Sequence, residues 1–268
     1  MILTIRHATR YRYDAPVGYA LQQLRLTPKS RNHHSVLDWQ VGIDGGRTEA
    51  EYEDQHANRV TLVSVERGAT DVTIVAEGRI ETSESGGIVG QHGGYAPLWL
   101  FRRETDLTRP GERIAALLDE NADLSGGDDA IAMLHRLSAI VRERVDYREG
   151  STSTVTSAED ALESGAGVCQ DQSHVFIAAA RRLGHPARYV GGYLCMDDRV
   201  DQDAGHAWAE VHVDGLGWTG FDVSNGISPD ERYVRVATGL DYSEAAPVAG
   251  LRIGNAEETM DVTLQVQQ

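Results

Sequence analysis

The stretch Ser164-Gly165-Ala166-Gly167-Val168-Cys169-Gln170-Asp171 decides how the second half of this chain is organised. Its glycines predict a tight turn, and the residues that follow predict a helix from Cys169 to Leu183, ended by Gly184 and Pro186. This places Cys169 at the N-terminus of a helix. Unsatisfied N–H groups and the helix dipole both favour a thiolate at that position. We therefore expect a reactive cysteine here.

Two later motifs supply partners for this thiol. They are His206-Ala207-Trp208-Ala209-Glu210 and Gly217-Trp218-Thr219-Gly220-Phe221-Asp222, and a hairpin turn is predicted between them at Asp214-Gly215-Leu216-Gly217. A diagonal pair across the hairpin brings Asp222 to His206 if both lie on one face, whereas a slip of one residue separates them. Cysteine, histidine and aspartate together activate a thiol nucleophile. The sequence leaves the register open.

Bulk composition excludes several classes of protein. The chain has 268 residues, with 41% hydrophobic and 25% charged residues, which is typical of a globular protein. Its net charge of −16 argues against nucleic acid as a partner. No apolar run approaches the roughly 18 residues of a membrane span, and the alternating N-terminus does not resemble a signal peptide. Two cysteines, Cys169 and Cys195, make no disulfide framework. We expect a cytoplasmic protein without cofactor that acts on a protein or peptide.

The order of predicted elements indicates an α+β fold in two parts. Residues 1–82 are rich in alternating and β-branched segments, and residues 83–94 contain five glycines, which predicts a loop. We therefore divide the chain into an antiparallel β domain over residues 1–95 and a catalytic domain over residues 96–268. The helices of the second part are expected to begin near Thr108-Arg109-Pro110, after Gly126-Gly127-Asp128, and at a capping box in Thr156-Ser157-Ala158-Glu159. Its strands are expected at 187–196, 207–213, 218–223 and 259–266.

The catalytic motifs resemble the transglutaminase-like superfamily of thiol enzymes. The resemblance is specific over about residues 150–225, and the front of the chain is similar to the N-terminal region that accompanies this domain in bacterial members. The matching segments are Gly167–Asp171, Ser173-His174, Arg182–Tyr193, His206–Val211, Gly215–Gly226, His7–Tyr13, Leu24–Pro28, and Asp54 with Asn58.

The resemblance implies a papain-like core, in which a helix bearing the cysteine packs on an antiparallel sheet bearing the histidine and the aspartate. By position, Cys169 is the nucleophile, His206 the base and Asp222 the orienting acid. The family often has proline directly after this aspartate and threonine two residues after it. Val223 and Ser224 stand there instead, which puts the end of the strand in doubt.

Stabilisation of the oxyanion is less clearly marked. The backbone N–H of Cys169 is one candidate donor, because it belongs to the first turn of a helix. For the second donor, Tyr147 and Gln170 are the alternatives, and neither is fixed by the motif. Trp208 is expected to pack around the hairpin or to wall the acyl site.

The implied activity is thiol-dependent acyl transfer from a peptide or glutamine-type amide through an acyl-enzyme on Cys169. Hydrolysis by a peptidase or amidase is favoured, because water is the default acceptor unless a site excludes it. The alternative within the same chemistry is a protein cross-linking transglutaminase, which passes the acyl group to an amine.

Two other classes stay in competition. A zinc site built from Cys169, His206 and Asp222 has suitable ligand types, but it lacks short paired spacings, so no metal is expected. A non-catalytic peptide-binding module would use the β domain, and the intact triad argues against it. Glu210 is expected to be a partly exposed strand residue, and the acidic stretch 197–203 a mobile loop that could gate the site.

Overall fold

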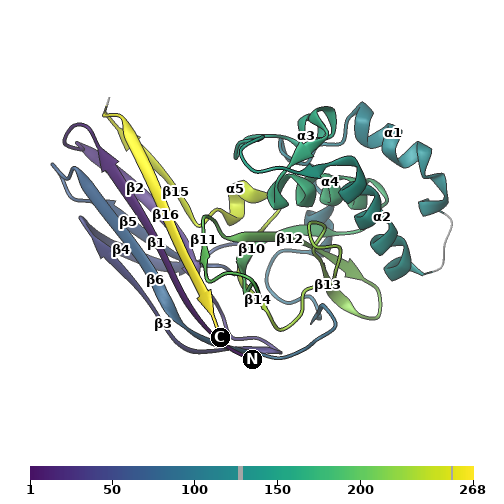
Figure 1. Ribbon diagram of the computed structural model, residues 1–268, viewed down its shortest axis with the longest axis horizontal. Coiled ribbons are helices and arrows are strands. Elements are labelled where there is room, and N and C mark those ends of the chain that lie inside the picture. The colour runs from purple at the N-terminus through teal and green to yellow at the C-terminus, as the bar shows by residue number, and fades with distance from the viewer. Residues whose placement is uncertain (126–128, 255) are drawn as a thin grey trace.

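The computed structural model of the protein describes residues 1–125, 129–254 and 256–268. Gly126-Gly127-Asp128, expected to precede a helix, therefore lies outside the described residues. Figure 1 shows a two-sheet β sandwich beside a unit in which helices cover a third sheet. The predicted α+β class, with an N-terminal antiparallel region and a helix-on-sheet core, is confirmed.

The sandwich is made from strands near both ends of the chain. One sheet has the order β11-β16-β1-β6-β3 and the other β15-β2-β5-β4. Inward-pointing apolar side chains alternate with polar ones along these strands, as in any sheet with one buried face. The bounds are β1 Ile2–Tyr13, β2 Tyr19–Thr27, β3 His34–Asp44, β4 Gly46–Glu53, β5 Arg59–Val65, β6 Asp71–Thr82, β11 Asp201–Gln202, β15 Val248–Ile253 and β16 Glu258–Gln267.

The second unit contains the predicted catalytic motifs. Its main sheet has the order β14-β10-β12-β13-β7, and α4 covers the face formed by Ala207, Ala209 and Val211. No helix among the described residues is long and apolar enough to cross a membrane. The bounds are β7 Ile88–Gly90, η1 Leu98–Arg102, α1 Glu112–Glu120, η2 Ala122–Ser125, α2 Ala130–Arg144, β8 Asp146–Tyr147, α3 Ala158–Ser164, β9 Ala166–Gly167, α4 Cys169–Arg182, β10 Ala187–Leu194, β12 His206–Val213, β13 Gly217–Phe221, β14 Tyr233–Gly239 and α5 Tyr242–Ala245.

Helix α1 begins later than the sequence predicts. Thr108 does not cap it; the N-cap is Gly111, which makes no side-chain cap bond of its own. Glu159 fills this role from α3, because its carboxylate accepts from the N–H groups of Gly111, Arg113 and Ile114. An acidic side chain from a second helix thus satisfies the donors that open the first one.

Helix α3 does begin with a capping box, one residue further along than predicted. Its N-cap is Ser157, whose hydroxyl accepts from the N–H of Asp160, while the Asp160 carboxylate accepts from the N–H of Ser157. The physical reason is that Glu159, the acid of the predicted box, is engaged with α1.

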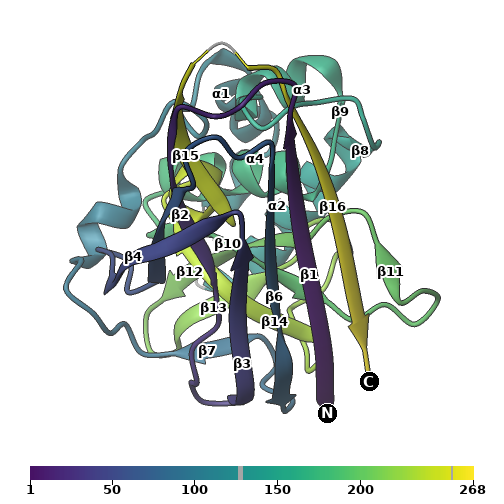
Figure 2. The same cartoon turned by 90° about the vertical axis from the view of Figure 1, so that its left-hand side faces the viewer.

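The last two strands return to the sandwich. Strand β16 pairs with β1 along nearly its whole length, and β15 pairs with β2 (Figure 2). The division at residue 95 placed these strands in the second domain, and the pairing instead makes them part of the sandwich. Without them β1 and β2 would each present an unpaired edge.

The acidic stretch before His206 is partly a strand. Asp201 and Gln202 of β11 pair with Gln265 and Leu264 of β16, and the buried Gln202 amide donates to the Leu194 carbonyl at 2.8 Å. The loop expected to be mobile is therefore anchored to the sandwich at this point.

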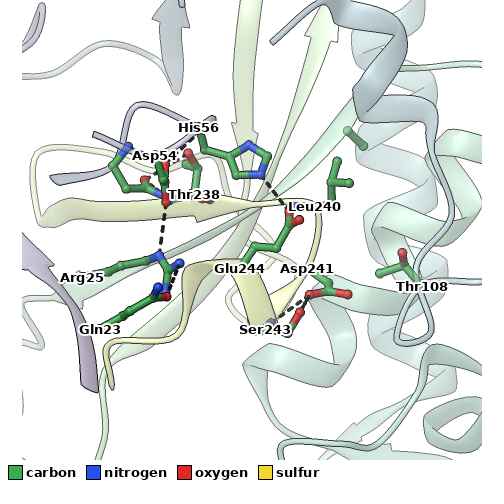
Figure 3. A network of polar contacts seen from close by, with 12 residues as sticks. Gln23, Arg25, Asp54, His56, Thr108, Thr238, Leu240, Asp241, Ser243 and Glu244 are labelled. Carbon is green, nitrogen blue, oxygen red and sulfur yellow. Dashed lines mark hydrogen bonds and ion pairs between the residues drawn. The ribbon is translucent and has the colours of Figure 1, made fainter. Parts of the chain in front are cut away.

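The loop between β4 and β5 joins the sandwich to the second unit. Asn58 donates to the carbonyl of Thr238 on β14 at 2.7 Å and accepts from its N–H at 2.8 Å. Asp54 pairs with Arg25 and also receives N–H bonds from this loop, and His56 lies 2.7 Å from Glu244 (Figure 3). The Asp54 and Asn58 of the bacterial N-terminal pattern therefore lie at the junction of the two units.

Candidate active site

Cys169 is the first residue of α4 and is 9% exposed. The preceding turn is closed by Asp171, whose Oδ2 accepts from the N–H of Val168 at 2.7 Å and from the Thr152 hydroxyl at 2.6 Å. A Cβ at Gly167 would lie 2.6 Å from the Cβ of Asp171, so only glycine fits there. Burial raises the pKa of Asp171. The glycine turn thus seats the thiol at a helix N-terminus, as the sequence predicts.

The hairpin has the register that unites His206 and Asp222. Ala209 lies opposite Phe221, so Asp222 follows opposite Trp208, and His206 stands diagonally across from it. His206 Nε2 lies 2.6 Å from Asp222 Oδ2, and the aspartate is fully buried. The register that the sequence left open therefore places the carboxylate against the imidazole.

Asp222 is held by more donors than the sequence indicates. Its Oδ2 also accepts from the Tyr233 hydroxyl at 2.6 Å and from Asn225 Nδ2 at 2.7 Å. Burial alone would raise the pKa of Asp222, but the bond and charge of His206 and the bonds from Tyr233 and Asn225 lower it below its ordinary value. Asn225 belongs to the segment Gly215–Gly226 that resembles the family. Tyr233 lies on a different strand, β14, and no local sequence pattern marks it as a partner of Asp222.

The imidazole of His206 has a strongly altered pKa. Burial, the largest influence, lowers it, but hydrogen bonds to Asp222 and Cys169 and the charges of both raise the pKa of His206 to about 10. Because the Asp222 carboxylate can only accept, Nε2 carries a proton toward it. This leaves Nδ1 as the ring nitrogen available to the thiol. His206 thus carries a positive charge beside Cys169.

The residues after Asp222 keep the site joined to the helix despite the missing proline and threonine. Val223 is buried in the core, and the Ser224 hydroxyl donates to Gln172 Oε1 on α4 at 2.7 Å. Gln172 in turn donates to the Val145 carbonyl at 2.7 Å. Strand β13 ends at Phe221, and the following turn is thereby fixed to the element that carries the thiol.

Trp208 supports His206 rather than walling the thiol. Its ring stacks on the imidazole with centroids 6.3 Å apart and planes 27° apart, and its side chain is buried. A Cβ on Gly192 would lie 2.9 Å from this indole, so the neighbouring strand makes room for it. Trp208 is absent from the lining of the described cavity that contains Cys169.

Tyr147 and Gln170, the two alternatives for an oxyanion donor, have different contacts. Tyr147 pairs with Gly167 through the short β8–β9 ladder, and burial together with the charges of Cys169, Glu149 and Asp222 raises the pKa of Tyr147 to about 12. It is thus a protonated donor close to the triad. Gln170 lines the cavity, but its amide donates to the Thr154 carbonyl at 3.4 Å.

Glu210 corrects one sequence expectation. It is fully buried instead of partly exposed, and its carboxylate lies 2.6 Å from Arg188 and 2.8 Å from Arg235. Burial opposes ionisation, yet the two guanidinium charges lower the pKa of Glu210 to about 2. The physical reason is that Arg188 of β10 and Arg235 of β14 cover this face of β12, so the carboxylate is buried against two guanidinium groups.

Cys169 and His206 line one cavity of about 350 Å³. The second unit contributes residues such as Tyr189 and Tyr242, and the sandwich contributes side chains of β1, β15 and β16. The cavity therefore lies between the two units. Among residues 1–125, 129–254 and 256–268, no group of three or more metal-ligating side chains is positioned to hold an ion.

Comparison with known proteins matches two separate parts of the chain to family models. Residues 120–223 match the transglutaminase-like superfamily, and residues 3–81 match the bacterial transglutaminase-like N-terminal region. An uncharacterized protein of Mycobacterium leprae is 26% identical over 277 residues, covering 98% of both chains. An uncharacterized protein of Mycobacterium tuberculosis is 27% identical over 286 residues, covering 98% of this chain and 91% of that one.

The fold also has a solved counterpart. The crystal structure of a proposed cysteine protease from Cytophaga hutchinsonii superimposes with a TM-score of 0.77, covering 100% of this chain and 91% of that chain. At 20% identity, this likeness concerns the fold alone. It extends over the sandwich as well as the unit that carries the thiol.

Proposed function

The chain belongs to the transglutaminase-like superfamily, with the N-terminal region of its bacterial members, and on this premise we propose that it cleaves amides through an acyl-enzyme on Cys169. The family supports thiol-dependent acyl transfer in general. The observation that carries the assignment to these residues is the buried Asp222–His206 hydrogen bond of 2.6 Å beside a cysteine at a helix N-terminus.

The first half-reaction uses all three residues. Cys169 Sγ attacks the carbonyl carbon of the amide, and a tetrahedral oxyanion forms. His206 then gives its proton to the leaving nitrogen as the C–N bond breaks, so that an amine or ammonia departs and a thioester remains. Asp222 keeps the imidazole in the required tautomer and stabilises its charged form.

The second half-reaction returns the thiol. Water gives a proton to His206 while its oxygen attacks the thioester, and the C–S bond breaks to release a carboxylic acid. We favour water as the acceptor, because it competes at any site that does not exclude it. The same thioester passes its acyl group to an amine if a lysine reaches it first, which is the cross-linking alternative.

Stabilisation of the oxyanion is assigned to two donors. One is the N–H of Cys169, which belongs to the first turn of α4 and has no carbonyl partner within the helix. The second is Tyr147, whose phenol is protonated at neutral pH; burial and the charges of Cys169 and Asp222 raise its pKa, and these charges place it near the reacting thiol. We prefer Tyr147 to Gln170, whose amide is directed at Thr154.

Alkylation of the thiol tests the assignment directly. The rate of iodoacetamide labelling at Cys169 is measured across pH by intact mass, in Cys195→Ala protein that carries a single thiol and in the same protein with His206→Ala. We expect rapid labelling below pH 7 that collapses without the imidazole. Labelling with the ordinary thiol pKa near 8.5, unaffected by His206, would refute the catalytic assignment.

The acceptor is identified by product mass. A peptide amide is incubated with and without a fluorescent primary amine. Hydrolysis yields the free acid in both mixtures, whereas a cross-linking enzyme incorporates the amine. Predominant incorporation at millimolar amine would replace our preference for water.

A further inference from the structure

The inner face of β1 changes its partner along the strand. At one end Leu3 and Ile5 pack against the second unit, and at the other Tyr11 and Tyr13 pack against the second sheet of the sandwich. His7 lies between these clusters, and its ring packs edge-on against Tyr193 of the first one. The middle of the strand therefore carries a polar side chain where its two ends carry apolar ones.

This middle section forms a wall of the cavity above the thiol. His7, Thr9 and Tyr11 line it, and so do Met260 and Val262 of the neighbouring β16. The register explains the alignment, because Val262 lies opposite Thr9 and Met260 lies opposite Tyr11, so their side chains share one face. Two strands from opposite ends of the sequence thus face Cys169 and His206 together.

The opposite wall is also apolar. It includes Tyr189 and Tyr242 from the second unit and Val248 of β15. At about 350 Å³ the cavity falls at the lower end of the roughly 300–1,000 Å³ of ligand pockets. It has the size and the lining to receive one bulky side chain next to the reacting carbonyl.

The charges of the residues that line the cavity also favour an apolar substrate side chain. Burial lowers the pKa of His7 to about 4, so this ring is neutral, and its Nδ1 is taken by the Tyr193 hydroxyl at 3.0 Å. Among the described lining residues none is lysine or arginine, and the one carboxylate, Asp203, is exposed. The cation in the described lining, the His206 imidazolium, is already paired with Asp222, so an acidic side chain would be desolvated there without a free cationic partner, which is unfavourable.

We propose that β1 and β16 form a specificity wall that selects acyl donors with a large aliphatic or aromatic side chain next to the scissile amide. This proposal rests on the proposed function and deepens it. Strand β16 serves the site twice, because it also pairs with β11, which ends four residues before His206. The sandwich then acts as part of the substrate site and not as an appended module.

Affinity labelling measures this preference without a known substrate. Short peptidyl chloromethyl ketones ending in phenylalanine, alanine or glutamate are reacted with Cys195→Ala protein, where the Cys169 thiolate displaces chloride and forms a thioether. We expect the phenylalanine reagent to label at least about tenfold faster than the glutamate reagent, the scale of discrimination in an apolar pocket. Equal rates for the three reagents would overturn the proposal.

Two variants of wall residues on β16 test whether this strand sets the side-chain preference. Val262→Trp fills the cavity and is expected to slow the phenylalanine reagent about tenfold, with iodoacetamide labelling unchanged. Thr263→Trp, on the exposed outward face of the same strand, is the matched control. Met260 is 57% exposed, so Met260→Lys is tolerated by the fold and is expected to accelerate the glutamate reagent. No response to either wall variant would refute the wall.

Iodoacetamide labelling distinguishes a failure of the proposed function from a failure of the specificity wall. If its labelling of Cys169 is ordinary and independent of His206, the proposed function has failed. If that labelling is fast and depends on His206 but the peptidyl reagents show no order of preference, only the specificity wall has failed. If Val262→Trp slows iodoacetamide as much as the phenylalanine reagent, β16 controls access to the thiol, and the selection of a side chain is overturned.

Discussion

One face of the central sheet holds two fully buried carboxylates with different partners. Glu210 stands on β12 between Arg188 and Arg235, while Asp222 follows β13 and binds His206, with further bonds from neutral groups. Both acids have a lowered pKa although burial opposes it in each case. The depth of burial therefore does not distinguish them.

The charged partners of Glu210 and Asp222 do distinguish the two carboxylates. The guanidinium groups around Glu210 are always charged, and that of Arg188 also lies 3.8 Å from the centre of the Trp218 ring. Such a cluster holds strands together and has no proton to exchange near neutral pH. The partner of Asp222 is an imidazole, whose charge changes as it accepts and releases a proton. A buried acid thus serves structure or chemistry according to whether its counter-ion titrates.

The largest expected effect comes from Asp222→Asn. The amide fills the same space, but it no longer enforces the tautomer or the charge of His206, so turnover should fall about 10²–10⁴-fold. The initial rate on a peptide amide checks this, with urea unfolding as the control for the fold. A loss of stability without a loss of turnover per folded molecule would make Asp222 a second structural acid.

Glu210→Gln should show the opposite behaviour. It leaves Arg188 and Arg235 buried beside a neutral group, which costs about 3–5 kcal/mol of unfolding free energy. Turnover per folded molecule should change little. Urea titration gives the stability and active-site titration with the chloromethyl ketone gives the folded fraction; a selective loss of turnover would break the contrast.

The dependence of stability on pH should separate the two acids further. The folded pKa of Glu210 is lowered from 4.5 to about 2, so its contribution is present above its unfolded pKa and is lost as pH falls through that window. The pKa of His206 is raised from 6.5 to about 10, so its contribution is present below 6.5 and is lost as pH rises through 10.

Unfolding free energies at several pH values check both limbs. Glu210→Gln should flatten the acid limb alone, whereas Asp222→Asn should flatten the alkaline limb and also remove the acid-limb contribution of Asp222 itself, at about 1.4 kcal/mol per unit of pKa shift removed. An alkaline limb that persists unchanged in Asp222→Asn would show that His206 owes its charge to another group.

Tyr233→Phe should have the smallest effect. It removes one of several bonds to Asp222, worth about 0.5–1.5 kcal/mol, or roughly 2- to 13-fold in turnover. The alkaline limb of activity should move to higher pH, because the carboxylate loses a donor, becomes more basic and holds the His206 imidazolium more strongly. If Tyr233→Phe lowers the unfolding free energy but leaves the pH profile of activity unchanged, Tyr233 contributes packing only.

Local patterns predicted the elements that carry the triad. The glycine turn before Cys169 and the hairpin signal after Val213 are short-range features, and the structure has a helix start and a tight antiparallel turn at these places. The register of the hairpin was not predictable, because a shift of one residue keeps the same turn residues and reverses every face.

Features that depend on distant partners could not be predicted. Glu210 has an ordinary position in an alternating strand, and the approach of Arg188 from β10 and Arg235 from β14 makes it a buried ion pair. Glu159 stands in a predicted capping box, but it caps a helix that lies earlier in the chain. The pairing of β16 with β1 likewise joins segments from opposite ends of the sequence, which no local period reports.

The β1–β16 pair also has a consequence for synthesis on the ribosome. Ile5 pairs with Val266, so one edge of β1 stays open until translation has passed residue 266. Closing so long a loop is slow and leaves that edge available to other chains in the meantime. A nascent chain thus carries Cys169, His206 and Asp222 before it carries Met260 and Val262. On our proposals, the growing protein carries its catalytic residues before it acquires the ability to choose a substrate.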